Sequence, residues 1–509
     1  MGKLAHGDVG ISISDTEWLA NTTHTIGGTS GLEITRSASY VIAASDSSAA
    51  GKAQADATCD GTNDNVEIQA GIDALTSGGA IQLLEGNFYI GSSIALAAGV
   101  NIVGQGGGTL YPATKVQLAA NTNMFTAALA GHSNINLKDM CLCATGYTGR
   151  LISAVETHTI SFANVYFYDA DTAVYAEYCW HWRFTNCTFD ECGTGTGANA
   201  AMHIFNGAVD NSSDWWLVDC TWEPCGGDQI YFDSTGVGID NSLFYFTGCK
   251  FENTPGESWN FITGSAQGII IHGGAMVRAT TAIAFALQEC VLSGTRFVLS
   301  ATADVHVTSN GNSITGIVSS GAGTNGIWLE SGNYNSILGN TVTQKDAGIR
   351  LTTANSNTLN GNNLYGCAVD GILIDNSEHN NITGNVCASN GDDGIEITAG
   401  SWMNLVTNNR LVSNGGTNLV DAGTTVIRSN PDWVTENSGT ATLLNANTSI
   451  VVAHGCSATP TLITITWAEN PTNAIADWWV DTIGATNFTL NGVDPGASNL
   501  DFMWEAKVR

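Results

Sequence analysis

Three aspartates in the C-terminal half of the chain could carry acid–base chemistry. Asp370 stands before Gly-Ile-Leu-Ile, and Asp392 and Asp393 stand before Gly-Ile-Glu-Ile, 22 and 23 residues further on. If these two segments are neighbouring β-strands, their carboxyl groups lie about 5 Å apart. Carboxyl groups this close shift each other's pKa values, which suits a general acid and a general base. We therefore predict a first catalytic group here, for hydrolysis of glycosidic bonds.

A second candidate group lies near the middle of the chain. Glu177 and Asp233 are separated by two steps of the repeat described below, and His203 lies between them. Two steps correspond to roughly 9–10 Å, near the upper limit for an inverting pair of carboxylates with a water molecule between them. Glu177 and Asp233 are therefore further catalytic candidates.

Aromatic and polar residues alternate with apolar residues around both groups, which predicts that they share one outward β face. The candidate substrate-binding residues on this face are Tyr175, His203, Tyr231, His306, Trp328, Arg350 and Glu396. Exposed aromatic rings beside carboxylates suit a sugar chain, because an aromatic side chain offers an apolar face next to polar partners. The sequence thus predicts a polysaccharide partner. An ordinary mixed, solvated face is the alternative interpretation.

A repeat with a period of 22 to 24 residues, lengthened by inserted loops near the middle of the chain, positions all of these side chains. It begins with the asparagines Asn312, Asn335, Asn357, Asn380 and Asn404, and a second motif recurs at Gly326, Gly348, Gly371 and Gly394. Short runs with apolar residues at every second position indicate strands, and a fixed period in the low twenties indicates a stacked repeat architecture. We predict a right-handed parallel β-helix of about a dozen coils, with the asparagines stacked at its corners.

The N-terminal part of this repeat resembles a known family. The stretch from Gly61 to Leu75, GTNDNVEIQAGIDAL, followed by GGAIQLLEGNFYI and NIVGQGGG, is similar to the N-terminal cap of the pectate-lyase-like β-helix proteins, especially phage tailspikes and related bacterial surface proteins. The resemblance implies a β-helix with a helical cap and polysaccharide binding on the sheet face. It leaves the reaction open, because the superfamily contains hydrolases, lyases and non-catalytic members.

The first aspartate group also resembles the polygalacturonase pattern, in which one aspartate precedes a strand and a pair precedes the next coil. The sequence departs from that pattern one coil later, where Asn414-Gly-Gly-Thr replaces Gly-His-Gly, and no Arg-X-Lys pair follows. Three functions therefore remain: a glycoside hydrolase, a calcium-dependent polysaccharide lyase, and a non-catalytic glycan-binding or structural virion or surface protein.

The charge of the chain narrows this choice. It has 16 basic and 46 acidic residues, a net charge of −30, which excludes nucleic acid as a partner and disfavours an anionic membrane. A lyase acting on uronates needs a cation, usually Ca²⁺, and a basic residue, whereas hydrolysis by two carboxylates needs no cofactor. We predict a hydrolase without a metal, with Ca²⁺ as the alternative.

Synthesis and location follow from the cysteines and the ends of the chain. Thirteen scattered cysteines without metal-type pairs predict a reducing cytoplasm as the place of synthesis. No signal-peptide core follows Met1, and no apolar run is long enough to span a bilayer. With the tailspike resemblance, this predicts a virion tail or an extracellular or cell-surface location.

Five segments are expected along the chain: an N-terminal arm (1–39), a cap with the first coil (40–100), the β-helix (101–428), a linker (429–440) and an antiparallel β-sandwich (441–509). The last segment is faintly similar to H-type lectin domains and to domains that end phage tail proteins. That resemblance implies sugar binding and a homotrimer.

Overall fold

The computed structural model describes residues 4–6, 9–11, 23–26, 32–35, 39–107, 112–128, 132–206, 211–234, 241–253, 259–285, 288–428, 436–445, 447–468, 478–492 and 499–508. The chain divides into two compact units, Met1–Thr188 and Phe189–Arg509. Each unit is described by itself.

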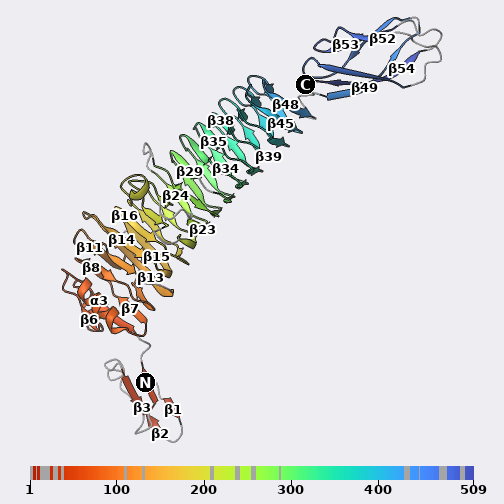
Figure 1. Ribbon diagram of the computed structural model, residues 1–509. Helices are drawn as coiled ribbons and strands as arrows, with labels where there is room; N and C mark the ends of the chain where they lie inside the picture. The colour runs from red at the N-terminus through yellow and green to blue at the C-terminus, as the bar shows by residue number, and fades with distance from the viewer. Residues whose placement is uncertain are drawn as a thin grey trace. The chain divides into compact units, whose positions relative to one another are not determined.

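The first unit contains two small hairpins, a helical cap and the first coils. The hairpins are β1 (Leu4–His6) with β2 (Val9–Ile11) and β3 (Thr23–Ile26) with β4 (Leu32–Thr35). The helices are α2 (Ala49–Lys52) and α3 (Asn65–Ala74). Ile68 and Ile72 of α3 are buried, and this helix packs against β5, β7, β8 and β9, so it covers the start of the solenoid as the sequence predicts (Figure 1).

The coils of the first unit are built from parallel strands. These are β5 (Ser39–Ala43), β6 (Ala57–Thr58), β7 (Gly79–Leu83), β8 (Gly86–Ile90), β9 (Ile94–Ala95), β10 (Val100–Val103), β11 (Thr114–Leu118), β12 (Phe125–Ala128), β13 (His132–Cys143), β14 (Arg150–Val155), β15 (His158–Tyr168), β16 (Thr172–Glu177) and β17 (Arg183–Thr185), with β18 (Thr188–Asp190) at the unit boundary. One sheet runs β5-β7-β10-β13-β15-β17, and a second runs β9-β12-β14-β16.

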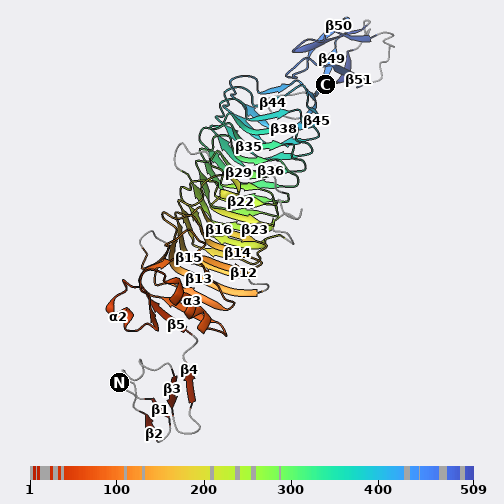
Figure 2. The same ribbon diagram turned by 60° about the vertical axis from the view of Figure 1, so that its left-hand side comes forward.

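The second unit is also wound from parallel strands. Among its described residues, one parallel sheet of ten strands, called the front sheet here, carries the candidate site (Figure 2). Its strands are β19 (Met202–Phe205), β22 (Ile230–Asp233), β25 (Ile262–Gly264), β29 (Thr281–Phe285), β32 (Ala303–Val307), β35 (Asn325–Glu330), β38 (Ala347–Thr352), β41 (Ile372–Asp375), β44 (Ile395–Ile397) and β47 (Leu419–Asp421). The 3-10 turn η1 (Gly197–Asn199) precedes β19.

Two further strands complete each coil behind the front sheet. The first set is β20 (Ser213–Val218), β23 (Asn241–Thr247), β26 (Ala266–Gln267), β27 (Ile270–His272), β30 (Val291–Ser293), β33 (Ser313–Thr315), β36 (Ser336–Leu338), β39 (Thr358–Asn360), β42 (Asn381–Thr383), β45 (Trp402–Thr407) and β48 (Thr424–Arg428). The second set is β21 (Thr221–Trp222), β24 (Lys250–Glu252), β28 (Ala275–Val277), β31 (Arg296–Val298), β34 (Val318–Ser320), β37 (Thr341–Thr343), β40 (Asn363–Tyr365), β43 (Val386–Ala388) and β46 (Arg410–Val412). The predicted right-handed parallel β-helix is confirmed.

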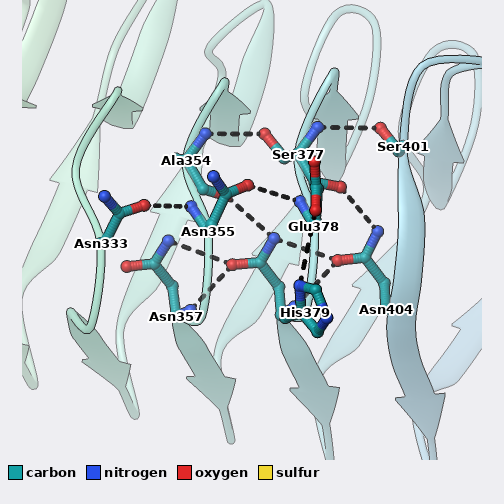
Figure 3. A network of polar contacts seen from close by, with 10 residues as sticks. Asn333, Ala354, Asn355, Asn357, Ser377, Glu378, His379, Ser401 and Asn404 are labelled. Atoms are coloured by element: carbon teal, nitrogen blue, oxygen red, sulfur yellow. Dashed lines mark hydrogen bonds and ion pairs between the residues drawn. The ribbon is translucent and has the colours of Figure 1, made fainter.

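Stacked asparagines hold neighbouring coils in register (Figure 3). The side chain of Asn357 donates to Asn380 Oδ1 at 3.0 Å, and Asn380 donates to Asn404 Oδ1 at 3.0 Å. All three are buried, at no more than 1 % exposure. Each of these amides also accepts a backbone N–H from the preceding coil, so the oxygens of Asn357, Asn380 and Asn404 all have partners. The predicted structural role of these asparagines is confirmed.

The left-handed backbone at the corners lies one residue before the stacked asparagines. Gly339, Gly361 and Gly384 have φ of 63°, 67° and 66°, and each precedes an asparagine of a second ladder. At the other corner the same conformation is adopted by Tyr334 and His379, at 57° and 56°. The ladder asparagines themselves therefore act through their side-chain amides, and not through a tolerance of positive φ.

A small β-sandwich ends the chain. One antiparallel sheet contains β49 (Glu436–Leu443), β54 (Leu500–Lys507) and β51 (Leu462–Trp467), and the other contains β50 (Ser449–Ala453), β53 (Asn487–Gly492) and β52 (Trp478–Asp481). Phe488 and Leu490 from one sheet pack with Phe502 and Trp504 from the other. The predicted sandwich is confirmed, but β49 begins at Glu436, inside the stretch expected as a linker, whose residues 429–435 lie outside the described residues.

The cysteines are all free and buried. This agrees with their expected role as small core residues, and the compartment of synthesis stays a prediction. In the described parts of the chain, no helix is long and apolar enough to cross a membrane.

Candidate functional site

Three carboxyl groups meet at the start of two neighbouring strands of the front sheet. Asp370 precedes β41, Asp393 precedes β44, and Glu396 lies within β44. Parallel pairing of these strands, with the Gly371 N–H donating to Asp393 O at 3.1 Å, stacks Asp370 directly beside Asp393. One carboxylate oxygen of each of the three residues lies within 4.8 Å of the others. The sequence placed Glu396 only among the binding residues, and it missed that Glu396, three positions after Asp393, turns toward the same point.

Burial and charge act together on Asp370. This residue is 1 % exposed and Asp393 is 8 % exposed, whereas Glu396 is half-buried. The pKa of Asp370 is raised to about 6, chiefly by burial and also by the charges of Glu396, Asp393 and Asp392, while a hydrogen bond from the Asp393 N–H at 3.1 Å lowers it. Three carboxylates this close do not all ionise easily, so the group holds a proton in weakly acidic solution. We name Asp370, Asp393 and Glu396 the carboxylate triad.

Asp392 lies outside the triad. It is exposed, and its carbonyl oxygen accepts the Gly416 N–H at 2.7 Å. Its charge still contributes to the raised pKa of Asp370.

The central group contains a second pair of titratable residues. His203 Nε2 lies 3.1 Å from Asp233 Oδ2, and the two side chains are 7 % and 14 % exposed. The ring of Tyr231 lies 5.5 Å from that of His203, and burial, together with the charge of Asp233, raises the pKa of Tyr231. The structure therefore brings His203, Tyr231 and Asp233 together, as the repeat predicts.

Glu177 belongs to the first unit. There Tyr175 donates its hydroxyl to Glu177 Oε2 at 2.8 Å, and the guanidinium carbon of Arg150 lies 3.6 Å from the centre of the Tyr175 ring. The proposed pairing of Glu177 with Asp233 stays a prediction, because each unit is described by itself.

The expected aromatic platform at Trp328 differs from what the structure shows. His306, Trp328 and Arg350 are neighbours in three successive strands, so they lie one above the other. The rings of His306 and Trp328 stack at 4.2 Å, and the Arg350 guanidinium lies 5.7 Å from the indole centre. His306 also pairs with Glu330 at 2.9 Å. Since neighbouring side chains lie over the indole, we expect Trp328 to offer no free face to a sugar ring, and its role in substrate binding stays a prediction.

The strand order and the asparagine ladders define the fold of this chain as a right-handed parallel β-helix. The profile of one family, described as "Periplasmic copper-binding protein (NosD)", matches residues 248–451. A search of curated protein sequences returned no match.

Several solved structures are similar over much of their length. Tailspike protein 3 of bacteriophage CBA120 is 13 % identical, with 83 % of this chain and 68 % of that chain covered and a TM-score of 0.47. The tailspike of E. coli bacteriophage HK620, solved with a pentasaccharide, is 13 % identical, with 97 % and 98 % covered and a TM-score of 0.44. The A-module of an Azotobacter vinelandii mannuronan C-5 epimerase is 14 % identical, with 72 % and 95 % covered and a TM-score of 0.31.

Copper does not fit the residues of the segment that the NosD profile matches. Within the described part of 248–451, the group of ligand-type side chains that converges is the carboxylate triad. Copper prefers imidazole and sulfur ligands in proteins, whereas carboxylates alone suit Ca²⁺, Mg²⁺ or Mn²⁺. Copper therefore has no part in the function proposed for these residues.

Proposed function

We propose that this protein hydrolyses glycosidic bonds of a polysaccharide at the carboxylate triad. The observation that carries the proposal is the meeting of Asp370, Asp393 and Glu396 within 4.8 Å, with the pKa of Asp370 raised to about 6. A protonated carboxyl beside ionised ones is the arrangement that acid–base cleavage of a glycosidic bond requires.

The burial of the three residues assigns their roles. Glu396 is half-buried on the front sheet, so it is the group that meets the sugar chain and protonates the leaving oxygen. Asp370 is buried beside Glu396 and Asp393 and keeps a proton, which limits the repulsion among the three groups. The carboxylate oxygens lie within 4.8 Å of one another, which is the short separation of a retaining pair, so in this proposal Asp393, whose Oδ1 accepts the Thr417 N–H, attacks the sugar, and a water molecule then releases it. Because the three groups titrate together, the proton belongs to the triad as a whole.

The charge of the chain indicates the substrate class. A net charge of −30 repels polyanions, so we propose a neutral or weakly charged polysaccharide. The lyase alternative needs a basic residue at the reacting carbon, and the triad contains only carboxylates.

A reducing-end assay against a panel of neutral and acidic polysaccharides tests the proposal. We expect new reducing ends with one substrate, activity that survives excess EGTA, and loss of at least a hundredfold in Asp393→Asn and Glu396→Gln. Asp233→Asn is the matched control and should keep most of its activity. Activity lost only in Asp233→Asn would move the reaction to the central group. Loss in EGTA with unsaturated products would indicate the calcium-dependent lyase, and binding without cleavage would indicate a non-catalytic glycan-binding protein.

The same proposal includes the setting in which the protein works. A polysaccharide substrate implies an extracellular, cell-surface or virion-tail location. We propose a homotrimer, which sedimentation velocity at several protein concentrations would test.

A further inference from the structure

A lysine and an aspartate form an ion pair inside the solenoid, close to the proposed active site. The Asp370 N–H donates at 3.1 Å to the carbonyl oxygen of Asp346, the residue after Lys345. Lys345 Nζ lies 3.1 Å from Asp304 Oδ1, and both side chains are 0 % exposed. The second oxygen, Asp304 Oδ2, accepts a hydrogen bond from the Ser319 hydroxyl. Lys345 Nζ also lies 3.5 Å from the carbonyl oxygen of Ser300. Lys345 and Asp304 thus lie in contact in a closed, dry environment.

The repeat shows that this pair replaces ordinary core residues. Asp304 occupies the position that Gly326 and Gly348 hold in the next two coils. A Cβ atom on Gly326 would come within 2.4 Å of a methyl group of Val342, so a side chain fits there only if the facing residue is small. In the coil of Asp304 the facing residue is Ser319, which is in register with Val342.

Lys345 also differs from the residues at the same position in the following coils. Backbone hydrogen bonds from Ala368 to Lys345 and from Gly391 to Cys367 place Lys345 where the next coil has Cys367 and the coil after it has Asn390. Asp304, Ser319 and Lys345 therefore all differ from the residues that the next coils have at their positions, and their side chains meet at one point. A break in an otherwise regular pattern that is coordinated in this way indicates a specific local chemistry.

Keeping two charges in this place is costly. Burying an ion pair costs several kcal/mol per ion before the attraction between the charges is counted. Burial raises the pKa of Asp304, opposed by the charge of Lys345 and by the hydrogen bond from Ser319. The neutral carboxylic acid of Asp304 is thereby made more accessible than in water. Well-oriented groups held in contact react with effective molarities of about 10⁵–10⁸ M.

We propose that Lys345 and Asp304 condense to an isopeptide bond inside the solenoid. Lys345 Nζ attacks Asp304 Cγ, an N–C bond forms, and the bond from Cγ to Oδ1 breaks. The ammonium gives up two protons and the carboxylate gives up one oxygen, and these leave together as one water molecule. The third proton stays on the amide nitrogen, so neither an oxidant nor an external proton is needed. The Ser319 hydroxyl stays hydrogen-bonded to the remaining oxygen and polarises the carbonyl.

The product fits the site better than the reactants do. Two buried charges become one neutral amide, whose oxygen already has the Ser319 hydroxyl as a donor and whose N–H faces the Ser300 carbonyl. The bond would tie the coil of β32 to the coil of β38 covalently. It does not depend on the proposed hydrolase function.

Mass spectrometry of the purified, denatured full-length chain tests this inference. We expect a mass lower by one water molecule than the sequence requires, and a tryptic map with one branched peptide that joins the segment containing Asp304 to the segment containing Lys345. Lys345→Met should show the full sequence mass, and Asp304→Asn should lose ammonia instead of water. Lys250→Met, at an exposed ion pair, is the matched control and should keep the loss of water.

Two results would overturn the inference. One is a wild-type chain in which Asp304 and Lys345 appear only in separate, linear peptides. The other is a loss of water that persists in Lys345→Met, since the lost water would then come from elsewhere. If a core variant fails to fold, the peptide map of the wild-type chain decides alone.

Discussion

Removing one asparagine from the inner ladder should weaken the solenoid at one coil only. The Asn362 side chain is 0 % exposed and makes four hydrogen bonds. Its Nδ2 donates to Ile337 O at 3.0 Å and to Asn385 Oδ1 at 2.8 Å, and its Oδ1 accepts from the Asn340 backbone N–H at 3.0 Å and from Asn340 Nδ2 at 2.9 Å.

Asn362→Ala leaves one buried backbone group without a partner, the Asn340 N–H. The Ile337 carbonyl still faces the Asn360 N–H in the parallel pairing of β36 with β39. Asn385 Oδ1 still accepts the backbone N–H of residue 362, and Asn340 Nδ2 still donates to Ile314 O. An unsatisfied buried group costs about 1–3 kcal/mol, so the local cost is about 1–3 kcal/mol. Since 1.4 kcal/mol is a factor of ten, hydrogen exchange of the coil should accelerate roughly 5-fold to 100-fold.

Hydrogen-exchange mass spectrometry is the appropriate assay, because a repeat protein opens locally and a global melting curve mixes many coils. Peptides covering residues 336–343 and 358–365 should exchange faster, while peptides from α3 should be unchanged. The control is Asn360→Ala, two residues away on the outside of the same coil, where the side chain is exposed. Equal exchange in the two variants would refute the claim that the buried ladder stabilises the solenoid.

Three further predictions follow from single contacts. Because the pKa of Asp370 is raised from 3.8 to about 6, the folded chain binds more protons than the unfolded chain between these values. The free energy of unfolding should therefore fall as pH rises through this window. The difference in this free energy between Asp370→Asn and wild type, measured by denaturant midpoints, should shift in favour of the variant by up to about 3 kcal/mol from pH 4 to pH 8. An equal difference at both pH values would contradict this. Trp328→Ala should leave the affinity for a glycan found in the substrate panel unchanged in calorimetry, because His306 and Arg350 already cover the ring, and a tenfold loss would show that the ring meets the sugar. Glu252→Gln breaks ion pairs of 2.7 Å to Lys250 and 2.9 Å to Arg278. Because all three side chains are partly exposed, the variant should lose less than about 1 kcal/mol of stability, and nothing in high salt. A larger change in thermal midpoint at either salt concentration would mean that these ion pairs stabilise the fold.

The repeat period made much of the site predictable. Residues one coil apart become vertical neighbours, so Asp370 could be placed beside Asp393, 23 positions on, without coordinates. His203 could be placed beside Tyr231 in the same way, across a coil lengthened to 28 positions by an inserted loop. Glu396 was harder to place, because its membership of the triad depends on the direction of its side chain along β44 and not on its position in the repeat. The burial that raises the pKa of Asp370 also has no signature in the motif Val-Asp-Gly-Ile.

The amino-acid sequence by itself determined the winding of this chain. The spacing of Asn335, Asn357 and Asn380, with alternating apolar residues between them, predicts stacked coils in which these asparagines bond to one another. The tertiary structure alone decided which side chains on neighbouring coils touch. It placed neighbouring side chains over the indole of Trp328, and it brought Lys345 to Asp304 across 41 positions of sequence. The physical reason is that periodicity fixes the height of a residue in the solenoid, whereas the direction of a long side chain depends on the space left by its neighbours, such as the room that Ser319 makes for Asp304.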